Sequence, residues 1–320
     1  MPGCGPPRAR KIVLYARNAP AHISRMASRD IFGADPAKGW RPWGALVPFL
    51  GIAFVVLTVI SLTAALQHIH LVDADENPVG LPGFMAFLLF PFAALGLVVL
   101  AWTRFVERRP LPSIGLVREH RSRTFLFGVL TGIVMAIAIV SGGWIAGGFS
   151  AGAFAIAFHS PPALGAIAIL LVCFALQSGV EEILFRGWML SAIAAKFGVA
   201  IAVLVSSAVF TVLHYDPHAT WLFVTNVFLF AVFACFWAIR TGNIWGVMGW
   251  HAGWNWLFAT GFEMRVTGLD AHMPALLVKM TPRGADYLTG GFEGPEGSVM
   301  CSVLLLAGIA FLGLRRKKAA

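Results

Sequence analysis

The chain reads LLVCFALQSGVEEILFRGWML from Leu170 to Leu190, and this stretch decides how the rest of the sequence is interpreted. Its residues are mostly apolar, yet Glu181, Glu182 and Arg186 lie among them. An ionised side chain at the centre of a bilayer costs about 2.5–3.5 kcal/mol on insertion scales. Three such groups in one apolar segment therefore indicate either a paired, functional polar site or a segment that lies outside the membrane.

The composition favours the membrane. Of the 320 residues, 58% are hydrophobic and only 12% are charged, whereas about 25% of the residues in a soluble domain are charged. The 11 tryptophans suit the interfacial belts of membrane helices. The net charge of +9 does not indicate nucleic acid as a partner, because the basic residues lie between apolar runs, where they set topology. We therefore predict an all-α, polytopic membrane bundle.

Apolar runs long enough to cross a bilayer need about 20 residues each. The sequence contains about eight candidates, of which the fourth is long and is interrupted by the charged motif. We predict transmembrane helices over residues 43–66, 83–105, 125–148, 163–195, 198–214, 219–239, 243–262 and 298–314.

The distribution of lysine and arginine predicts the orientation of the chain. Residues 1–42 form a basic tail, the loop after the second span holds five arginines, and residues 315–320 are again basic. The loops 67–82 and 263–297 are acidic on balance. Eight crossings place every basic segment on one side, so both termini are expected to be cytoplasmic. The extracytoplasmic loop 263–297 is too long for a plain connector and is expected either to cap the bundle or to be mobile.

Helical geometry separates the two glutamates. Neighbouring residues on a helix point about 100° apart, so both carboxylates cannot face the same direction. Glu182 and Arg186 are four residues apart with the glutamate first, which is the better order for an ion pair. We therefore predict a structural ion pair between Glu182 and Arg186. Glu181 is left free to face a cavity and to act as a general base.

Three more polar residues, His214, His251 and Asn255, fall within apolar spans. If the chain turns near Gly198, Glu182 and His214 lie sixteen residues on either side of it, at one level about 24 Å from the turn. His251 and Asn255 lie one helical turn apart and share a face. A carboxylate, two imidazoles and an amide can thus meet on three helices.

This set supports two forms of acyl-bond hydrolysis. A carboxylate and a histidine can activate water, while a histidine and an asparagine can donate to a developing oxyanion. Alternatively, Glu181, His214 and His251 could hold a divalent metal such as zinc that activates the water. The candidate catalytic residues are Glu181, Glu182, His214, His251 and Asn255.

Three motifs in this order resemble the CAAX prenyl endopeptidase and bacteriocin-processing family, the CPBP or Abi intramembrane proteases. They are Glu181-Glu182-Ile-Leu-Phe-Arg186, Phe210-x-x-x-His214 and His251-x-x-x-Asn255. The resemblance covers residues 165–260 and implies an intramembrane metalloendopeptidase of eight helices. It also implies that Glu181 and His214 activate the water, and that His251 and Asn255 form the oxyanion hole.

The resemblance further implies a membrane-associated or lipid-anchored peptide or protein as substrate, in the bacterial inner (plasma) membrane. A non-catalytic immunity or scaffold protein of the same family is the alternative. A transporter or proton relay would use the same buried charges. Against that third hypothesis, the sequence shows no inverted repeat and no paired broken helices.

Overall fold

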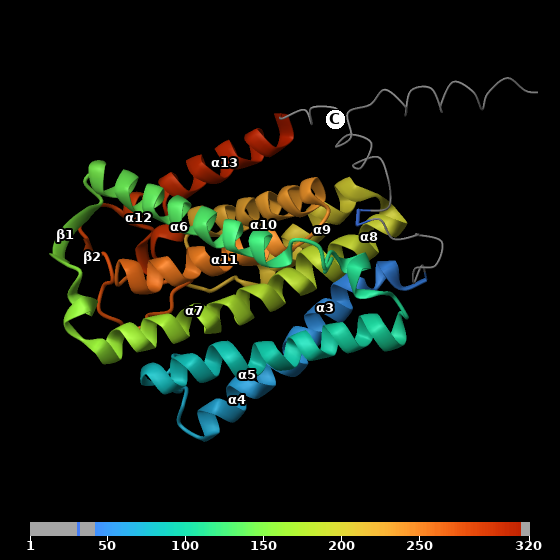
Figure 1. Ribbon diagram of the computed structural model, residues 1–320, viewed down its shortest axis with the longest axis horizontal. Coiled ribbons are helices and arrows are strands. Elements are labelled where there is room, and N and C mark those ends of the chain that lie inside the picture. Colours follow the sequence, from blue (N-terminus) through green and yellow to red (C-terminus); the bar gives the residue numbers. More distant parts are fainter. Residues whose placement is uncertain (1–30, 33–41, 315–320) are drawn as a thin grey trace, which may run out of the picture.

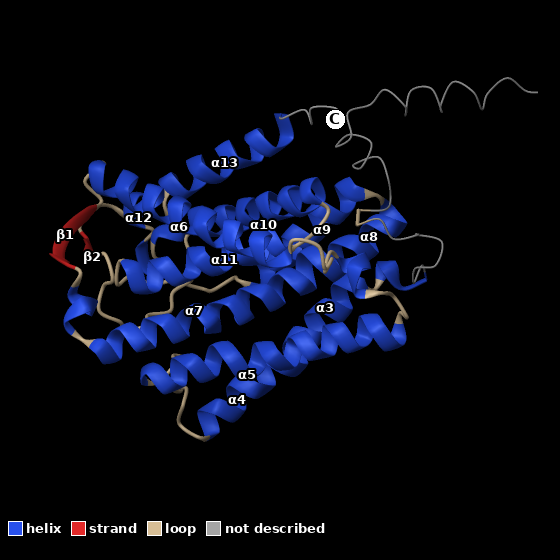
Figure 2. Ribbon diagram, viewed as in Figure 1, coloured by secondary structure: helices blue, strands red, loops and turns tan. Residues whose placement is uncertain are grey.

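The computed structural model describes residues 31–32 and 42–314. These residues form a bundle of helices with a small two-stranded sheet at one end (Figures 1 and 2). The predicted tails, residues 1–42 and 315–320, lie outside the described residues except for positions 31, 32 and 42. The α-helices are α3 (Val47–Val55), α4 (Ser61–His68), α5 (Gly80–Ala101), α6 (Arg121–Ile145), α7 (Pro161–Glu182), α8 (Leu190–Phe197), α9 (Val199–Leu213), α10 (Trp221–Thr241), α11 (Trp245–Trp256), α12 (Asp286–Thr289) and α13 (Val299–Leu314).

Four π-helical turns continue α-helices without a break in the chain direction. They are η3 (Val56–Ile60) after α3, η4 (Trp102–Val106) after α5, η7 (Ile183–Met189) after α7 and η8 (Leu257–Gly261) after α11. The motif-bearing segment Pro161–Phe197 is therefore one long helix with a π-helical turn inside it.

All eight predicted spans are helical, and their ends lie within four residues of the predicted ones. Among the described residues, five helices are long and apolar enough to cross a bilayer: Val47–His68, Gly80–Val106, Arg121–Ile145, Pro161–Phe197 and Trp221–Thr241. The helices Val199–Leu213 and Val299–Leu314 are apolar but shorter. The prediction of a polytopic membrane bundle is confirmed.

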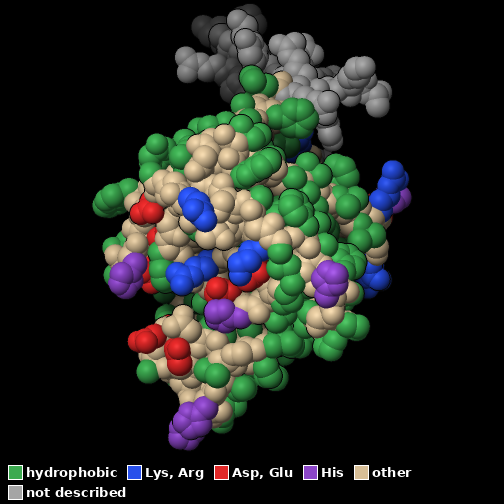
Figure 3. All heavy atoms as spheres, turned by 90° about the vertical axis from the view of Figure 1, so that its left-hand side faces the viewer, with side chains coloured by type: hydrophobic (Ala, Val, Ile, Leu, Met, Phe, Trp, Pro, Cys, Tyr) green, Lys and Arg blue, Asp and Glu red, His purple; other side chains and the backbone are tan. Residues whose placement is uncertain are grey.

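The small sheet is an addition to the predicted all-α fold. Strands β1 (Phe149–Phe154) and β2 (Val278–Pro282) are antiparallel and pair two connecting segments that are far apart in the sequence. Strand β2 lies in the segment 263–297, which also contains α12 and short 3₁₀ turns. This segment packs on the end of the bundle and is called the cap below, in the arrangement that one of the two predicted alternatives describes. Figure 3 views this end, where charged and histidine side chains gather between apolar ones.

Glycines allow α11 to cross α6 with the two backbones in contact. The spacing Gly-x-x-x-Gly occurs on both helices, with Gly128 and Gly132 on α6 and Gly249 and Gly253 on α11. A Cβ atom on Gly253 would lie 2.4 Å from the carbonyl oxygen of Val129, and one on Gly132 would lie 2.2 Å from that of Trp250. Small residues permit this approach between membrane helices. The crossing fixes α11, which carries two of the candidate site residues.

We expect Gly253→Ala to lower the stability of the protein by about 1–3 kcal/mol, because the added methyl group meets backbone that cannot rotate away. Gly165→Ala, in α7, is the matched control, since a Cβ atom there has nothing within 4 Å. Thermal unfolding of the two variants in detergent measures the difference. Equal midpoints for both variants would contradict the close crossing of α6 and α11.

Two glycine turns set the level of the helices that surround α7. Gly198 separates α8 from α9 with a φ of 88°, and Gly242 ends α10 with a φ of 69°. Positive φ is accessible to glycine at little cost. The Gly198 turn is at the predicted position, and Gly242 lies in the gap between the predicted helices 219–239 and 243–262. Beyond the first turn, the Ser206 hydroxyl donates to the carbonyl oxygen of Phe185 at 2.9 Å, which joins α9 to η7.

A buried carboxylate in the segment after α5 holds the far end of η7. The Trp188 indole Nε1–H donates to Glu107 Oε1 at 2.6 Å, and Arg109 Nη1 lies 3.1 Å from Glu107 Oε2. Burial raises the pKa of the Glu107 carboxyl, and the Arg109 charge opposes that rise. Arg109 Nη2 also donates to the Ser191 hydroxyl at 2.7 Å. These contacts fix the rotation of the long helix about its axis.

Candidate active site

The charged motif lies where the long helix is enclosed on every side. Each residue from Gln177 to Ser191 is buried, so other helices surround this part of α7 and η7 completely. A helix that is buried all round occupies the centre of a bundle. A π-helical turn in such a position frequently marks a functional site. The burial agrees with the first of the two expectations, a paired polar site inside the bundle.

The expected contact between Glu182 and Arg186 is present. Arg186 Nη1 lies 3.2 Å from Glu182 Oε1, and both side chains are fully buried. The guanidinium carbon lies 4.2 Å from the centre of the Phe210 ring, an arrangement in which the aromatic face attracts the cation. The ring of His214 stacks on the same phenylalanine at 4.1 Å. Phe210 therefore contacts both the Arg186 guanidinium of the ion pair and the ring of His214.

His251 contacts both glutamates. Its Nδ1 lies 2.9 Å from Glu182 Oε1, and its Nε2 lies 3.8 Å from Glu181 Oε2. Glu182 Oε1 is therefore shared between an imidazole and a guanidinium. A buried carboxylate needs such partners, because an unpaired charge is costly to bury. Glu181 Oε2 is buried and accepts no hydrogen bond from a described residue, so this oxygen is available to a water molecule.

His214 follows the last residue of α9 and is half-buried. Its Nδ1 lies 2.8 Å from the carbonyl oxygen of Phe210. A carbonyl oxygen only accepts, so Nδ1 carries the proton and Nε2 of the neutral ring is an acceptor. The hydrogen bond that one ring nitrogen makes decides the role of the other. His214 is thus held as the tautomer that can take a proton from water.

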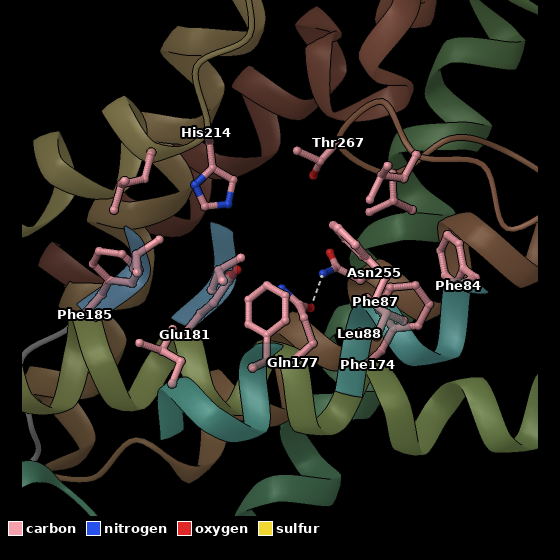
Figure 4. A pocket seen from close by; sticks show the side chains of 17 residues that line it. Phe84, Phe87, Leu88, Phe174, Gln177, Glu181, Phe185, His214, Asn255 and Thr267 are labelled. Carbon is pink, nitrogen blue, oxygen red and sulfur yellow. Dashed lines mark hydrogen bonds between the residues drawn. The ribbon is translucent and has the colours of Figure 1, made fainter. Parts of the chain in front are cut away.

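Asn255 faces a glutamine that the sequence analysis did not single out. Asn255 Nδ2 donates to Gln177 Oε1 and to the Ser178 hydroxyl oxygen, both at 3.4 Å, and the first of these bonds is drawn in Figure 4. Gln177 precedes Glu181 by four residues, so the two share a helix face. The four-residue spacing from Glu181 could therefore have indicated Gln177 as a site residue.

Glu181, His214 and Asn255 line one cavity of about 200 Å³. Figure 4 shows His214 and Thr267 on one side of it, with Gln177 and Glu181 on the other. The remaining walls are apolar and come from α3, η3, α5, α7, η7, the end of α9 and the cap: Val55, Val59, Phe84, Phe87, Leu88, Phe92, Leu95, Phe174, Phe185, Leu213, Val266 and Leu269. Glu181, His214 and Asn255 thus lie in a largely apolar cavity, which is typical of a site for a ligand with a large apolar part.

His251 does not line this cavity. It lines a smaller adjoining space of about 30 Å³, together with His214 and Thr267. The structure therefore brings Glu181, His214 and Asn255 to one cavity. His251 instead contacts the two glutamates and lines the adjoining space. His251 and Asn255 share a face of α11, but one turn of helix separates them along its axis, so they reach different partners.

The sequence predicts Glu181, His214 and His251 as the ligands if the protein binds a metal. No group of three or more histidine, cysteine, aspartate or glutamate side chains in the described part of the chain is arranged to hold a metal ion. Glu181, His214 and His251 are not brought together as such a group in the described part of the chain.

The cap closes over the cavity through Thr267. The backbone N–H and the hydroxyl of Thr267 donate to Glu296 Oε2 at 2.7 and 3.0 Å. The other carboxylate oxygen, Oε1, accepts from the Trp254 indole at 2.9 Å. One glutamate thus ties the cap to α11, three residues from His251. The sequence offered no sign of this role, because Glu296 lies about forty residues beyond the helix that it contacts.

Glu296→Ala is expected to accelerate amide hydrogen exchange at Thr267 and its neighbours by about tenfold or more, because each hydrogen bond to a charged group contributes about 1.5–3 kcal/mol. Hydrogen exchange followed by mass spectrometry measures the effect in peptides that span residues 263–270. Glu76→Ala, in the exposed connection between α4 and α5, is the control. Unchanged exchange around Thr267 would show that Glu296 does not secure the cap.

Comparison with known proteins finds one family model that matches part of the chain. Residues 162–257 match the family model described as type II CAAX prenyl endopeptidase Rce1-like, which spans under a third of the chain. The matched segment contains both glutamates, His214, His251 and Asn255. No curated protein and no solved structure matches the chain.

Proposed function

We propose that this protein cleaves a peptide bond within the bilayer. The premise is that residues 162–257 are an Rce1-like type II CAAX prenyl endopeptidase domain in an integral membrane protein. Its substrate is a membrane-associated or lipid-anchored peptide or protein. The observation that carries the proposal is the common cavity of Glu181, His214 and Asn255, in which a carboxylate, an imidazole and an amide face one apolar space.

In this mechanism Glu181 and His214 activate the attacking water. The carboxylate of Glu181 has a free oxygen, and His214 presents the acceptor Nε2. A water held between them loses a proton as it attacks the peptide carbonyl carbon. The carbon–nitrogen bond then breaks, and the same proton passes to the leaving amine, so the base is regenerated. General base and acid catalysis of this kind contributes about 10²–10⁴-fold to a rate.

Asn255 is the proposed donor to the oxyanion that forms on the carbonyl oxygen. Its Nδ2 makes two long hydrogen bonds, to Gln177 and Ser178, both at 3.4 Å, so its position is held before the substrate arrives. Donors that are fixed in advance stabilise a developing charge without reorganisation. When the oxyanion forms, one N–H group can exchange its long hydrogen bond for a bond to the oxyanion.

The contacts of His251 favour a positioning role in place of the expected oxyanion donation. Its Nδ1 is committed to Glu182, and its Nε2 faces Glu181. It links the ion pair of Glu182 and Arg186 to the proposed base. The buried network therefore fixes where the Glu181 carboxylate points.

The apolar walls support the substrate class. Phe84, Phe87 and Phe92 of α5 and Phe174 of α7 line the cavity that holds the polar residues. Such walls favour an apolar peptide or an attached lipid chain over a soluble, charged peptide. We also propose that the enzyme resides in a bacterial inner membrane, with its basic end and both termini on the cytoplasmic side.

The test compares membranes that contain the wild-type protein with membranes that contain Glu181→Ala at the same level. Quantitative proteomics is expected to find at least one membrane peptide that is cleaved only with the wild type. If no peptide differs and the biological effect of the protein survives Glu181→Ala, the proposal is wrong and a non-catalytic immunity or scaffold role is favoured. Ion flux driven by a pH gradient in liposomes would instead identify a transporter.

A further inference from the structure

A second cleft, of about 720 Å³, lies at the end of the bundle opposite the β1–β2 sheet. Four arginines line it: Arg104, Arg108, Arg118 and Arg121. The other lining residues are apolar or proline, with Trp245 at the start of α11. No acidic side chain is among the lining residues. The cleft therefore carries a concentrated positive charge, and no acidic side chain in its lining offsets that charge.

These arginines are free to bind a ligand. All four are exposed, and none makes an ion pair with a described residue. The nearby Arg109 differs, because it is paired with Glu107 inside the fold. Arg121 is also the first residue of α6, where the unpaired N–H groups of a helix start add partial positive charge. The guanidinium fork matches phosphate oxygens in geometry as well as charge.

The position of the cleft indicates that the phosphate belongs to a lipid headgroup. Arg104 lies at the end of the apolar helix Gly80–Val106, and Arg121 begins the apolar helix Arg121–Ile145. The cleft thus lies where two membrane-length helices reach the lipid headgroups. Trp245 is half-buried, and its indole N–H donates to the Val117 carbonyl oxygen, which holds the ring at that level. Tryptophan is enriched at this depth of a membrane.

We propose that this cleft binds the phosphate-bearing headgroup of an anionic phospholipid. The four arginines take the phosphate oxygens, while Leu111 and Leu116 of the lining contact the adjoining glycerol and upper acyl carbons. Basic recesses between membrane helices on the cytoplasmic side have this property, since that leaflet carries the anionic lipids. The site is separate from the cavity of Glu181 and does not depend on the proposed hydrolysis.

The test uses the full-length chain in phosphatidylcholine nanodiscs that contain a small share of photoactivatable phosphatidylglycerol. After irradiation, mass spectrometry measures the yield of lipid attached to residues 104–121. We expect Arg108→Gln/Arg118→Gln to lower this yield by about tenfold or more, because each lost contact is a hydrogen bond to a charged group. The charge-matched control, Arg123→Gln/Arg283→Gln, changes two arginines that do not line the cleft and is expected to retain the wild-type yield.

Two further arms separate the possible ligands. A photoactivatable phosphatidylcholine probe is expected to label residues 104–121 much less than the anionic probe; equal labelling would overturn the proposal. Excess inorganic phosphate is expected to leave the labelling unchanged. If it abolishes the labelling, the cleft binds soluble phosphate and the lipid assignment is wrong. An equal loss in both arginine pairs would show a general effect of protein charge, which also overturns the site.

Discussion

Replacing Glu181 with glutamine is expected to slow peptide-bond cleavage by about 10²–10⁴-fold, because the amide cannot accept the proton of the attacking water. Glutamine has nearly the same size as glutamate, and Glu181 makes no hydrogen bond through Oε2 that the change would break. The rate is measured in detergent or liposomes on a membrane peptide that only the wild-type protein cleaves. The loss should appear in kcat, since the lost interaction is made in the transition state.

The matched control is Glu76→Gln, which makes the same chemical change at an exposed position in the connection between α4 and α5. It is expected to cleave at the wild-type rate. Thermal unfolding must show that Glu181→Gln is folded. A folded Glu181→Gln protein that keeps the wild-type rate would remove Glu181 from the mechanism.

Replacing Arg186 with methionine is expected to destabilise the protein by about 3–5 kcal/mol, because it leaves the Glu182 carboxylate buried without its cation. Both side chains are fully buried, so water cannot compensate for the loss. Phe210 would also lose the guanidinium that lies over its ring. Unfolding in a graded series of sodium dodecyl sulfate concentrations measures the free energy.

The double variant Glu182→Gln/Arg186→Met provides the control. With both charges removed no uncompensated charge remains, and replacing a complete buried pair is often close to neutral. We therefore expect the double variant to recover most of the stability that Arg186→Met loses. A double variant as unstable as the single one would mean that shape at this position matters more than charge.

The helices and one contact of the site could be predicted from the sequence for simple reasons. An apolar run long enough to cross a bilayer usually forms a transmembrane helix, so the eight helical segments follow from length and hydropathy. The contact between Glu182 and Arg186 follows from helical pitch, because residues four apart are always neighbours. The turn at Gly198 was predicted from the ends of the apolar runs.

The position of His251 could not be predicted, since it depends on how α11 is rotated against α7. That rotation is set by the backbone contact between α6 and α11, and the sequence shows only glycines there. The roles of Glu107 and Glu296 were missed because their partners lie far away in the chain. The sheet was missed because β1 and β2 are short and follow membrane-length or irregular segments.

The π-helical turn Ile183–Met189 has a consequence for how this chain can change in length. Such a turn contains one residue more than the α-helix that it replaces. Deleting one residue in it can be absorbed by a return to the tighter α-helical pitch, so the segment that follows keeps nearly the same orientation. Inserting a further residue has no such outlet, because the turn already holds its extra residue, and would rotate the following segment by about 100°. That rotation would carry Trp188 away from Glu107.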